Sequence, residues 1–173
     1  MKKLINQLIK IGFNTDDYVI ICIGTQRAYA DSVGPSVGSA ILKAFPNAIV
    51  YGSIDNNCHA LNIESIIKKI KRKHSDKKIL AIDACITNDD NKLGDIKVIK
   101  GSIKPGAGVG KNLPQIGDYS IKAYVLCTEH KYLLCDDLLN QHPSKNEVYT
   151  RVNNMVQKIS GAIIEVQSLR SAQ

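Results

Sequence analysis

The sequence has little aromatic character and no long hydrophobic run. It contains no tryptophan and only two phenylalanines among 173 residues, so it lacks the rings on which single-stranded nucleic acid would stack. No apolar segment approaches the roughly 20 residues of a membrane-spanning helix. Residues 1–12 begin with lysines, but Asn6, Gln7 and Lys10 interrupt the apolar residues, so we expect no signal peptide. These absences predict a cytoplasmic globular protein with no membrane partner.

Paired cysteine motifs are also absent. The five cysteines are odd in number, and no two are spaced as Cys-x-x-Cys. This pattern predicts reduced thiols and argues against a disulfide framework or a structural zinc site. Cys58 directly precedes His59, which leaves a thiol–imidazole dyad as a weaker alternative. Cys127 and His130 have the spacing of two metal ligands but no second pair, so we expect no metal and no cofactor.

Positive charge is in excess and is concentrated in one segment. The formal net charge is +7, and much of it lies in residues 68–78, KKIKRKHSDKK. Ile66, Ile67 and Ile70 recur at helical spacing around these lysines, so we interpret the charges as the solvated face of a helix. The alternative is a nucleic-acid patch, whose affinity would fall steeply with salt.

Apolar runs alternate with amphipathic segments, which predicts an α/β fold. Residues 18–23 and 77–85 are almost wholly apolar, as expected for parallel strands buried on both faces. Residues 94–103 alternate in polarity and suit an edge strand. The predicted strands are 18–23, 47–54, 77–85, 94–103 and 119–127, and the predicted helices are 1–12, 35–45, 61–73, 131–141 and 144–170. We therefore expect one domain over residues 1–173, a three-layer α/β/α sandwich around a mixed, mostly parallel sheet.

Two carboxylates follow the predicted buried strands. Asp31 lies in the loop after residues 18–23, and Asp83 ends the apolar part of residues 77–85. Ligands collect at the carboxyl ends of parallel strands, so both acids are expected at one rim of the sheet. Two adjacent carboxyl groups do not both ionise readily, which leaves a base to activate water and an acid to protonate a leaving amine. The alternative is that both acids have only local structural roles. Asp83 would then cap a helix or loop, and Asp31 would accept hydrogen bonds from nearby backbone amides.

A glycine-rich loop, KPGAGVGK at residues 104–111, is a candidate substrate contact. It departs from the phosphate-binding Walker motif, because Pro105 occupies the first glycine position and Asn112 follows Lys111. A backbone that approaches a substrate closely, as a set of amide donors for an oxyanion, is the preferred interpretation.

Three segments together resemble a known family. IGTQRAYADSVGP at residues 23–35, AIDAC at 81–85 and KPGAGVGKNLPQIGD at 104–118 closely resemble the YyaC family of sporulation proteins, as does HALN at 59–62. That family is related to the bacterial germination protease, which degrades small acid-soluble spore proteins. Both are similar in fold to the hydrogenase maturation endopeptidases. The resemblance implies a phosphorylase/hydrolase-like fold.

The resemblance also implies a set of site residues. Asp31 and Asp83 correspond to the proposed catalytic aspartates of the germination protease. The protease's glycine loop corresponds to residues 105–110, and the TQRAY segment approaches the same site. The residues expected to bind substrate are Thr25, Arg27, Pro105, Gly106, Gly108 and Gly110. The hydrogenase peptidases bind a metal of their substrate through two acids and a histidine, but residues 95–118 contain no histidine here, so no metal ligands are expected.

The function expected from these features is an aspartate-dependent peptidase that acts in sporulation. Its partner would be a protein or peptide substrate, such as small acid-soluble spore proteins, in the cytoplasm of the sporulating cell or the forespore. No nucleic acid is expected, and the sequence leaves homo-oligomerisation open. The alternative is a regulator on the same fold that binds a peptide or an anionic ligand, for example through Arg27, and cleaves nothing.

Overall fold

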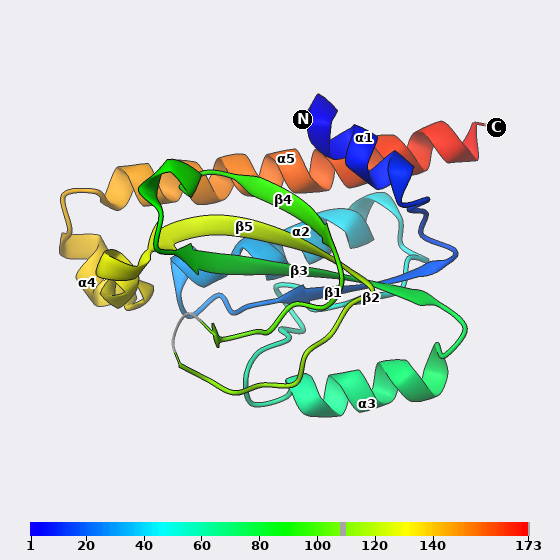
Figure 1. Cartoon of the computed structure of the whole chain (residues 1–173), viewed down its shortest axis with the longest axis horizontal. Coiled ribbons are helices and arrows are strands. Elements are labelled where there is room, and N and C mark those ends of the chain that lie inside the picture. Colours follow the sequence, from blue (N-terminus) through cyan, green and yellow to red (C-terminus); the bar gives the residue numbers. More distant parts are fainter. Residues whose placement is uncertain (108–109, 173) are drawn as a thin grey trace.

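A five-stranded sheet with helices on both faces forms the protein. The computed structural model describes residues 1–107 and 110–172 (Figure 1). The strands are β1 (Tyr18–Ile23), β2 (Val50–Tyr51), β3 (Lys78–Thr87), β4 (Ile96–Lys100) and β5 (Tyr119–Cys127). The helices are α1 (Lys2–Lys10), α2 (Val33–Ala44), α3 (Ile63–Lys73), α4 (Asp136–Gln141) and α5 (Lys145–Ser171), with 3-10 turns at Tyr29–Asp31, Asp90–Lys92 and Thr128–Leu134.

The strand order in the sheet is β2-β1-β3-β5-β4. β1 runs parallel to β2 and β3, and β3 runs parallel to β5. β4 is antiparallel to β5 and lies at the edge, where its alternating sequence placed it. The predicted mixed, mostly parallel sheet is confirmed.

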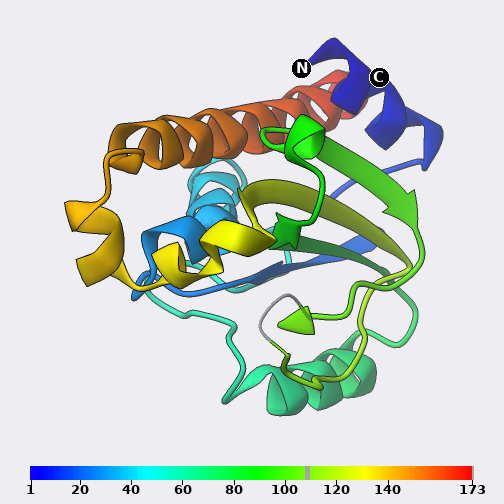
Figure 2. The same cartoon turned by 60° about the vertical axis from the view of Figure 1, so that its left-hand side comes forward.

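Helices cover the two faces of the sheet unequally. α1, α2 and α5 lie on one face and share a hydrophobic core with the strands, whereas α3 covers the opposite face (Figures 1 and 2). Every residue of β1 is buried between these layers, which explains its continuous run of Val, Ile and Cys. The predicted three-layer sandwich is therefore confirmed. None of the described helices combines the length and apolar character that crossing a bilayer requires.

α3 explains the concentration of positive charge. Its Ile63, Ile67 and Ile70 are buried against the sheet. The basic residues of the helix are exposed on its outer face, namely Lys68, Lys69, Lys71, Arg72 and Lys73. This arrangement fits the interpretation of the charged segment as the solvated face of an amphipathic helix.

Several element boundaries differ from the sequence-based expectation. α2 begins at Val33, before Pro35, because a proline in the first turn sacrifices no intrahelical hydrogen bond. β2 is only two residues long, and residues 131–141 form the end of a 3-10 turn followed by α4, separated by an extended Cys135. In α1 the buried contacts are made by Leu4, Ile5 and Leu8, whereas Ile9 is 47% exposed.

The start of α2 is packed directly against the end of β1. A Cβ atom added to Gly34 would lie 2.1 Å from the carbonyl oxygen of Ile23 and 2.8 Å from its amide nitrogen. Only glycine permits this contact, because the obstacle is backbone and cannot rotate away. The contact fixes the loop between β1 and α2 against the sheet.

We expect Gly34→Ala to lower the free energy of unfolding by about 3 kcal/mol or more, because the added methyl group forces β1 and α2 apart. Gly161→Ala in α5 is the matched control, since the nearest atom to its Cβ would be Met1 Sδ at 3.4 Å. This helical substitution should be neutral or stabilise by up to about 1 kcal/mol. Urea denaturation of both variants measures the difference, and equal stabilities would contradict the prediction.

Candidate functional site

A cavity opens where the winding of the sheet reverses. α2 connects β1 to β2, which lies on one side of β1 in the sheet. α3 packs on the other face of the sheet and connects β2 to β3, which lies on the opposite side of β1 (Figure 1). Crevices in open α/β sheets form at such switch points, at the carboxyl ends of the strands. The cavity at the ends of β1 and β3 has a volume of about 920 Å³, and both Asp31 and Asp83 line it.

Asp83 lies inside β3 and does not end it, which corrects the sequence-based expectation. It pairs with Ile23, the last residue of β1, and is 6% exposed. β3 continues to Thr87 because β5 supplies its hydrogen bonds there after β1 has ended. The four residues beyond Asp83, residues 84–87, span roughly 13 Å at the usual strand rise and all line the cavity as a ledge.

Asp31 is held by a tight loop beside the end of β1. It is the last residue of the 3-10 turn Tyr29–Asp31, and its Oδ2 accepts a hydrogen bond of 3.0 Å from the Thr25 amide. Gly24 has φ 139° and approaches Asp31 so closely that a Cβ would meet the Asp31 carbonyl oxygen at 2.1 Å. The Asp136 carboxylate anchors the turn from outside by accepting the Tyr29 amide at 2.7 Å.

The alternative that Asp31 only accepts hydrogen bonds from nearby amides explains one of its two carboxylate oxygens. Its Oδ2 does satisfy a nearby amide, that of Thr25. No residue in the described part of the chain donates a hydrogen bond to the other oxygen, Oδ1. Since Asp31 also lines the cavity, one carboxylate oxygen is left for a ligand there.

The two acids have different proton affinities. Burial raises the pKa of Asp31 to about 6, against the opposing effects of the Thr25 amide and the Lys111 charge. Burial and the charge of Asp31 raise the pKa of Asp83 well above its usual value, and Lys122 acts in the opposite direction. The carboxyl groups therefore influence each other through space. Asp83, the more deeply buried of the two acids, therefore holds its proton more strongly than Asp31 does.

The predicted substrate-binding residues do not all share this cavity. Thr25, Arg27, Pro105 and Gly106 line it. Gly110 is not part of the lining, and Gly108 lies outside the described residues.

The glycine loop uses two of its amides internally. Gly110 N donates to Ala107 O at 3.2 Å, and Lys111 N donates to Gly106 O at 3.0 Å. These two amides stabilise the turn, so they do not serve as the oxyanion donors that the glycine pattern suggested.

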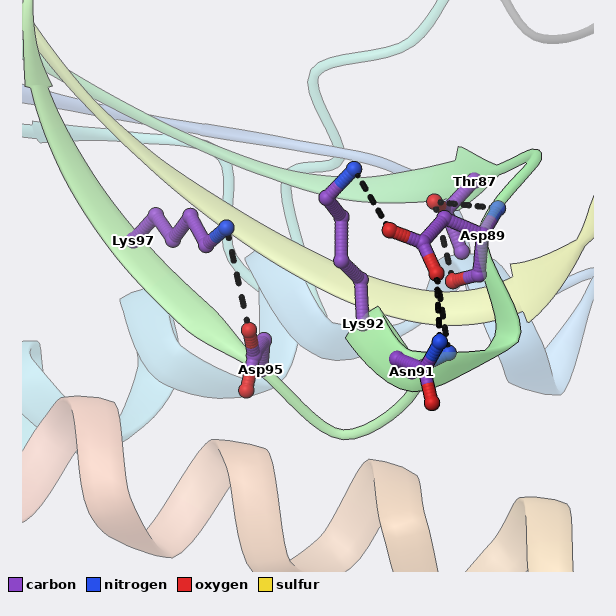
Figure 3. Close-up of polar contacts among 6 residues, drawn as sticks. All are labelled: Thr87, Asp89, Asn91, Lys92, Asp95 and Lys97. Carbon is purple, nitrogen blue, oxygen red and sulfur yellow. Dashed lines mark hydrogen bonds and ion pairs between the residues drawn. The ribbon is translucent and has the colours of Figure 1, made fainter.

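Sequence reasoning missed the lysines of the cavity, which are Lys92, Lys104, Lys111 and Lys122. Lys92 Nζ pairs with Asp89 Oδ2 at 2.9 Å, and Asn91 and Thr87 hold Asp89 in a turn (Figure 3). Lys122 lies on β5 directly beside Asp83 on β3. In the sequence, Lys122 stands out only as a lysine within a mostly apolar strand. That Asp83 is its neighbour follows only from the strand order of the sheet.

The cysteines near the acids do not form the alternative dyad. Cys58 is fully buried, and burial and the charge of Asp83 raise its pKa to about 12. His59 Nδ1 accepts the Leu61 amide at 3.2 Å, as assigned from hydrogen-bond geometry, and makes no bond to Cys58. Cys85 lines the cavity, and its pKa is likewise raised to about 12, mainly by burial. Both thiols remain protonated and unreactive at neutral pH.

A metal-ligand cluster is not found in the part of the chain that the structure describes. Cys127 Sγ lies 3.0 Å from His130 Nδ1, but no group of three His, Cys, Asp or Glu side chains is arranged to hold an ion.

The family model described as "Protein of unknown function (DUF1256)" matches residues 1–159. The chain belongs to the DUF1256 family. Among curated proteins, this DUF1256 chain is 37% identical over 108 residues to "Uncharacterized protein YyaC" of Bacillus subtilis, which covers 62% of the chain and 52% of that protein. It is 22% identical over 176 residues to a germination protease of Clostridium perfringens, covering 85% of the chain and 54% of the protease. The chain thus spans about half the length of these relatives.

A solved structure shares the fold. The [NiFe] hydrogenase maturation protease HycI from Thermococcus kodakarensis superposes with a TM-score of 0.55 at 15% sequence identity, covering 87% of this chain and 92% of HycI. The DUF1256 chain therefore has a protease-like α/β fold, as the sequence resemblance implied.

We expect Asp31→Asn to stabilise the fold at neutral pH. A raised pKa means that folding favours the protonated acid, so the stability present below pH 3.8 is lost as the pH rises toward about 6. Asparagine keeps the acceptor for the Thr25 amide and removes the charge. The expected gain at pH 7.5 is at most about 3 kcal/mol, shrinking several-fold near pH 4.

Thermal and urea unfolding of wild type and variant at both pH values measures this effect. Asp55→Asn, at an exposed aspartate, is the control and should show no such pH-dependent gain. A variant that is less stable than wild type at pH 7.5 would contradict the assignment of Asp31 as a half-buried carboxylate whose charge disfavours folding.

Proposed function

We propose that the protein is a peptidase in which Asp31 and Asp83 activate water together. The observation that carries this proposal is the lining of one cavity by two acids with separated proton affinities, Asp31 with a pKa of about 6 and Asp83 with a pKa far above its usual range. Two carboxyl groups tuned apart by their surroundings form an acid–base pair. The protease-like fold and the similarity to germination proteases support the same reaction class.

The first step is addition of water to the peptide carbonyl. The Asp31 carboxylate takes a proton from water as its oxygen bonds to the carbonyl carbon, and Asp83 gives its proton to the carbonyl oxygen. The product is a neutral gem-diol. Asp31 is now protonated and Asp83 is a carboxylate.

The second step breaks the C–N bond. Asp31 gives its proton to the leaving nitrogen, and Asp83 takes one back from a hydroxyl of the gem-diol. The products are a carboxylic acid and an amine, and both side chains return to their starting states. The reaction consumes one water molecule and no other co-reactant.

Spore proteins are the substrate class that we propose to test first, with small acid-soluble spore proteins as the leading candidates. The support is the similarity to YyaC and to germination proteases, together with the family resemblance of the segments that contain Asp31 and Asp83. Thr25, Arg27, Pro105 and Gly106 are proposed to contact the peptide at the cavity wall, and the turn at Gly110 to support this wall.

Purified wild type should cleave such a spore protein, and Asp31→Asn and Asp83→Asn should each lower kcat by about 100-fold or more, the usual contribution of general acid–base catalysis. Asp55→Asn is the matched control and should retain wild-type activity. Mass spectrometry of the products locates the cleaved bond. Full activity in both site variants would exclude the mechanism, and tight binding without turnover would favour the non-catalytic regulator.

The pH profile should follow the two carboxyl groups. Asp31 must be ionised to accept a proton, so kcat/KM should rise as the pH increases through about 6. Asp83 must be protonated, so activity should fall again at the higher pH where it ionises. Steady-state kinetics from pH 4 to 10 measures both limbs. An activity that stays constant from pH 4 to 7 would contradict the role of Asp31.

A further inference from the structure

One row of residues crosses the sheet beneath the cavity. Ile23 of β1, Asp83 of β3, Lys122 of β5 and Lys97 of β4 are successive partners in the strand register. Residues in register on neighbouring strands project from the same face of the sheet, and the strands lie about 4.8 Å apart. Lys122 is therefore the immediate neighbour of Asp83 on the cavity side, and it lines the same cavity.

Lys122 differs from two neighbouring lysines, Lys92 and Lys97, in having no ion-pair partner among the described residues. Lys92 pairs with Asp89 at 2.9 Å, and Lys97 pairs with Asp95 at 3.8 Å (Figure 3). Within the described residues, no carboxylate lies within ion-pair distance of the Lys122 ammonium, although the side chain is half-buried. The buried acid in register with Lys122 on the adjacent strand is Asp83, and a half-buried cation acts on such a neighbour through space.

We propose that Lys122 is a positioning residue of the acid pair, whose ammonium stabilises the carboxylate that forms on Asp83 while the scissile carbonyl is protonated. This inference rests on the proposed function. In the addition step, negative charge leaves Asp31 and appears on Asp83. A fixed cation on the Asp83 side favours that transfer and requires no rearrangement during the reaction.

The groups that face Asp83 come from every element around it. Asp31 approaches from the β1–α2 loop, Cys58 from the segment before α3, and Cys85 from β3 itself. The two thiols are neutral, and the Asp31 carboxylate repels negative charge on Asp83. Lys122 of β5 is the cation that lowers the pKa of Asp83.

The same geometry explains why Asp83 is usable as an acid. Burial and Asp31 both raise its pKa, whereas a hydrogen bond from the Ala84 amide and the charge of Lys122 lower it. Lys122 partly offsets them and brings the proton affinity of Asp83 closer to that of its acceptor. Catalytic efficiency rises with such matching.

The test combines a direct titration with kinetics. Lys122→Met removes the charge and keeps an unbranched apolar chain, whereas Lys122→Arg keeps the charge. Carbon-13 NMR of aspartate carboxyl groups, assigned with Asp83→Asn, reports the pKa of Asp83 without any substrate. Lys122→Met should raise this pKa by about one unit or more, the usual effect of losing a nearby cation.

In kinetic measurements on the spore protein, Lys122→Met should lower kcat about tenfold with little change in KM, and should move the alkaline limb of the pH profile upward. Lys122→Arg should keep kcat and the alkaline limb of the pH profile close to those of the wild type. Lys97→Met is the matched control, because Lys97 lies in the same row and outside the cavity lining. It should leave the Asp83 titration and kcat close to wild type.

The outcomes separate this inference from the proposed function. An Asp83 titration that is unchanged in Lys122→Met, or that moves equally in Lys97→Met, overturns the role of Lys122 even when peptidase activity is robust. A loss of activity in Lys122→Met without a shift of the alkaline limb of the pH profile also overturns this role, since it indicates that Lys122 is only structural. A shifted titration with no cleavage by the wild type overturns the proposed function and leaves the electrostatic pairing of Lys122 and Asp83 intact.

Discussion

Burial of a carboxyl group within a sheet strand is the constraint around which this protein is organised. Asp83 lies in the middle of β3 at 6% exposure, where an ionised acid without partners would cost several kcal/mol. Burial raises the pKa of Asp83 and so favours the protonated acid, and Lys122 on the adjacent strand acts in the opposite direction. The reversal of the sheet's winding at β1 and β3 then opens the space in which that proton is useful.

The second acid depends on backbone contacts and not on side-chain packing alone. Gly24 and Gly34 bring the loop carrying Asp31 against the end of β1, at distances that no other residue allows. The Asp136 carboxylate and the Thr25 amide fix the same turn from two sides. Main-chain contacts therefore set where the backbone of Asp31 lies at the edge of the cavity.

The sequence alone predicted the layers of the fold, the parallel and antiparallel strands, and the placement of Asp31 and Asp83 at the same rim of the sheet, where both line one cavity. Apolar runs such as residues 18–23 have few structural solutions, and the motifs around both acids were recognisable. Lys122 was not predictable, because its role depends on the register between β3 and β5, which are separated by an antiparallel strand in the chain. The internal hydrogen bonds of the glycine loop were missed for a similar reason: composition indicates a turn but not which amides the turn consumes.

The unequal lengths of β1 and β3 have a further consequence. β1 stops opposite Asp83, whereas β3 extends four residues beyond it. An extended polypeptide advances about 3.3 Å per residue, so a chain laid along this shelf would occupy it with about four residues. The offset between the ends of these two neighbouring strands therefore leaves residues 84–87 of β3 beside the cavity, with room for about four residues of extended chain.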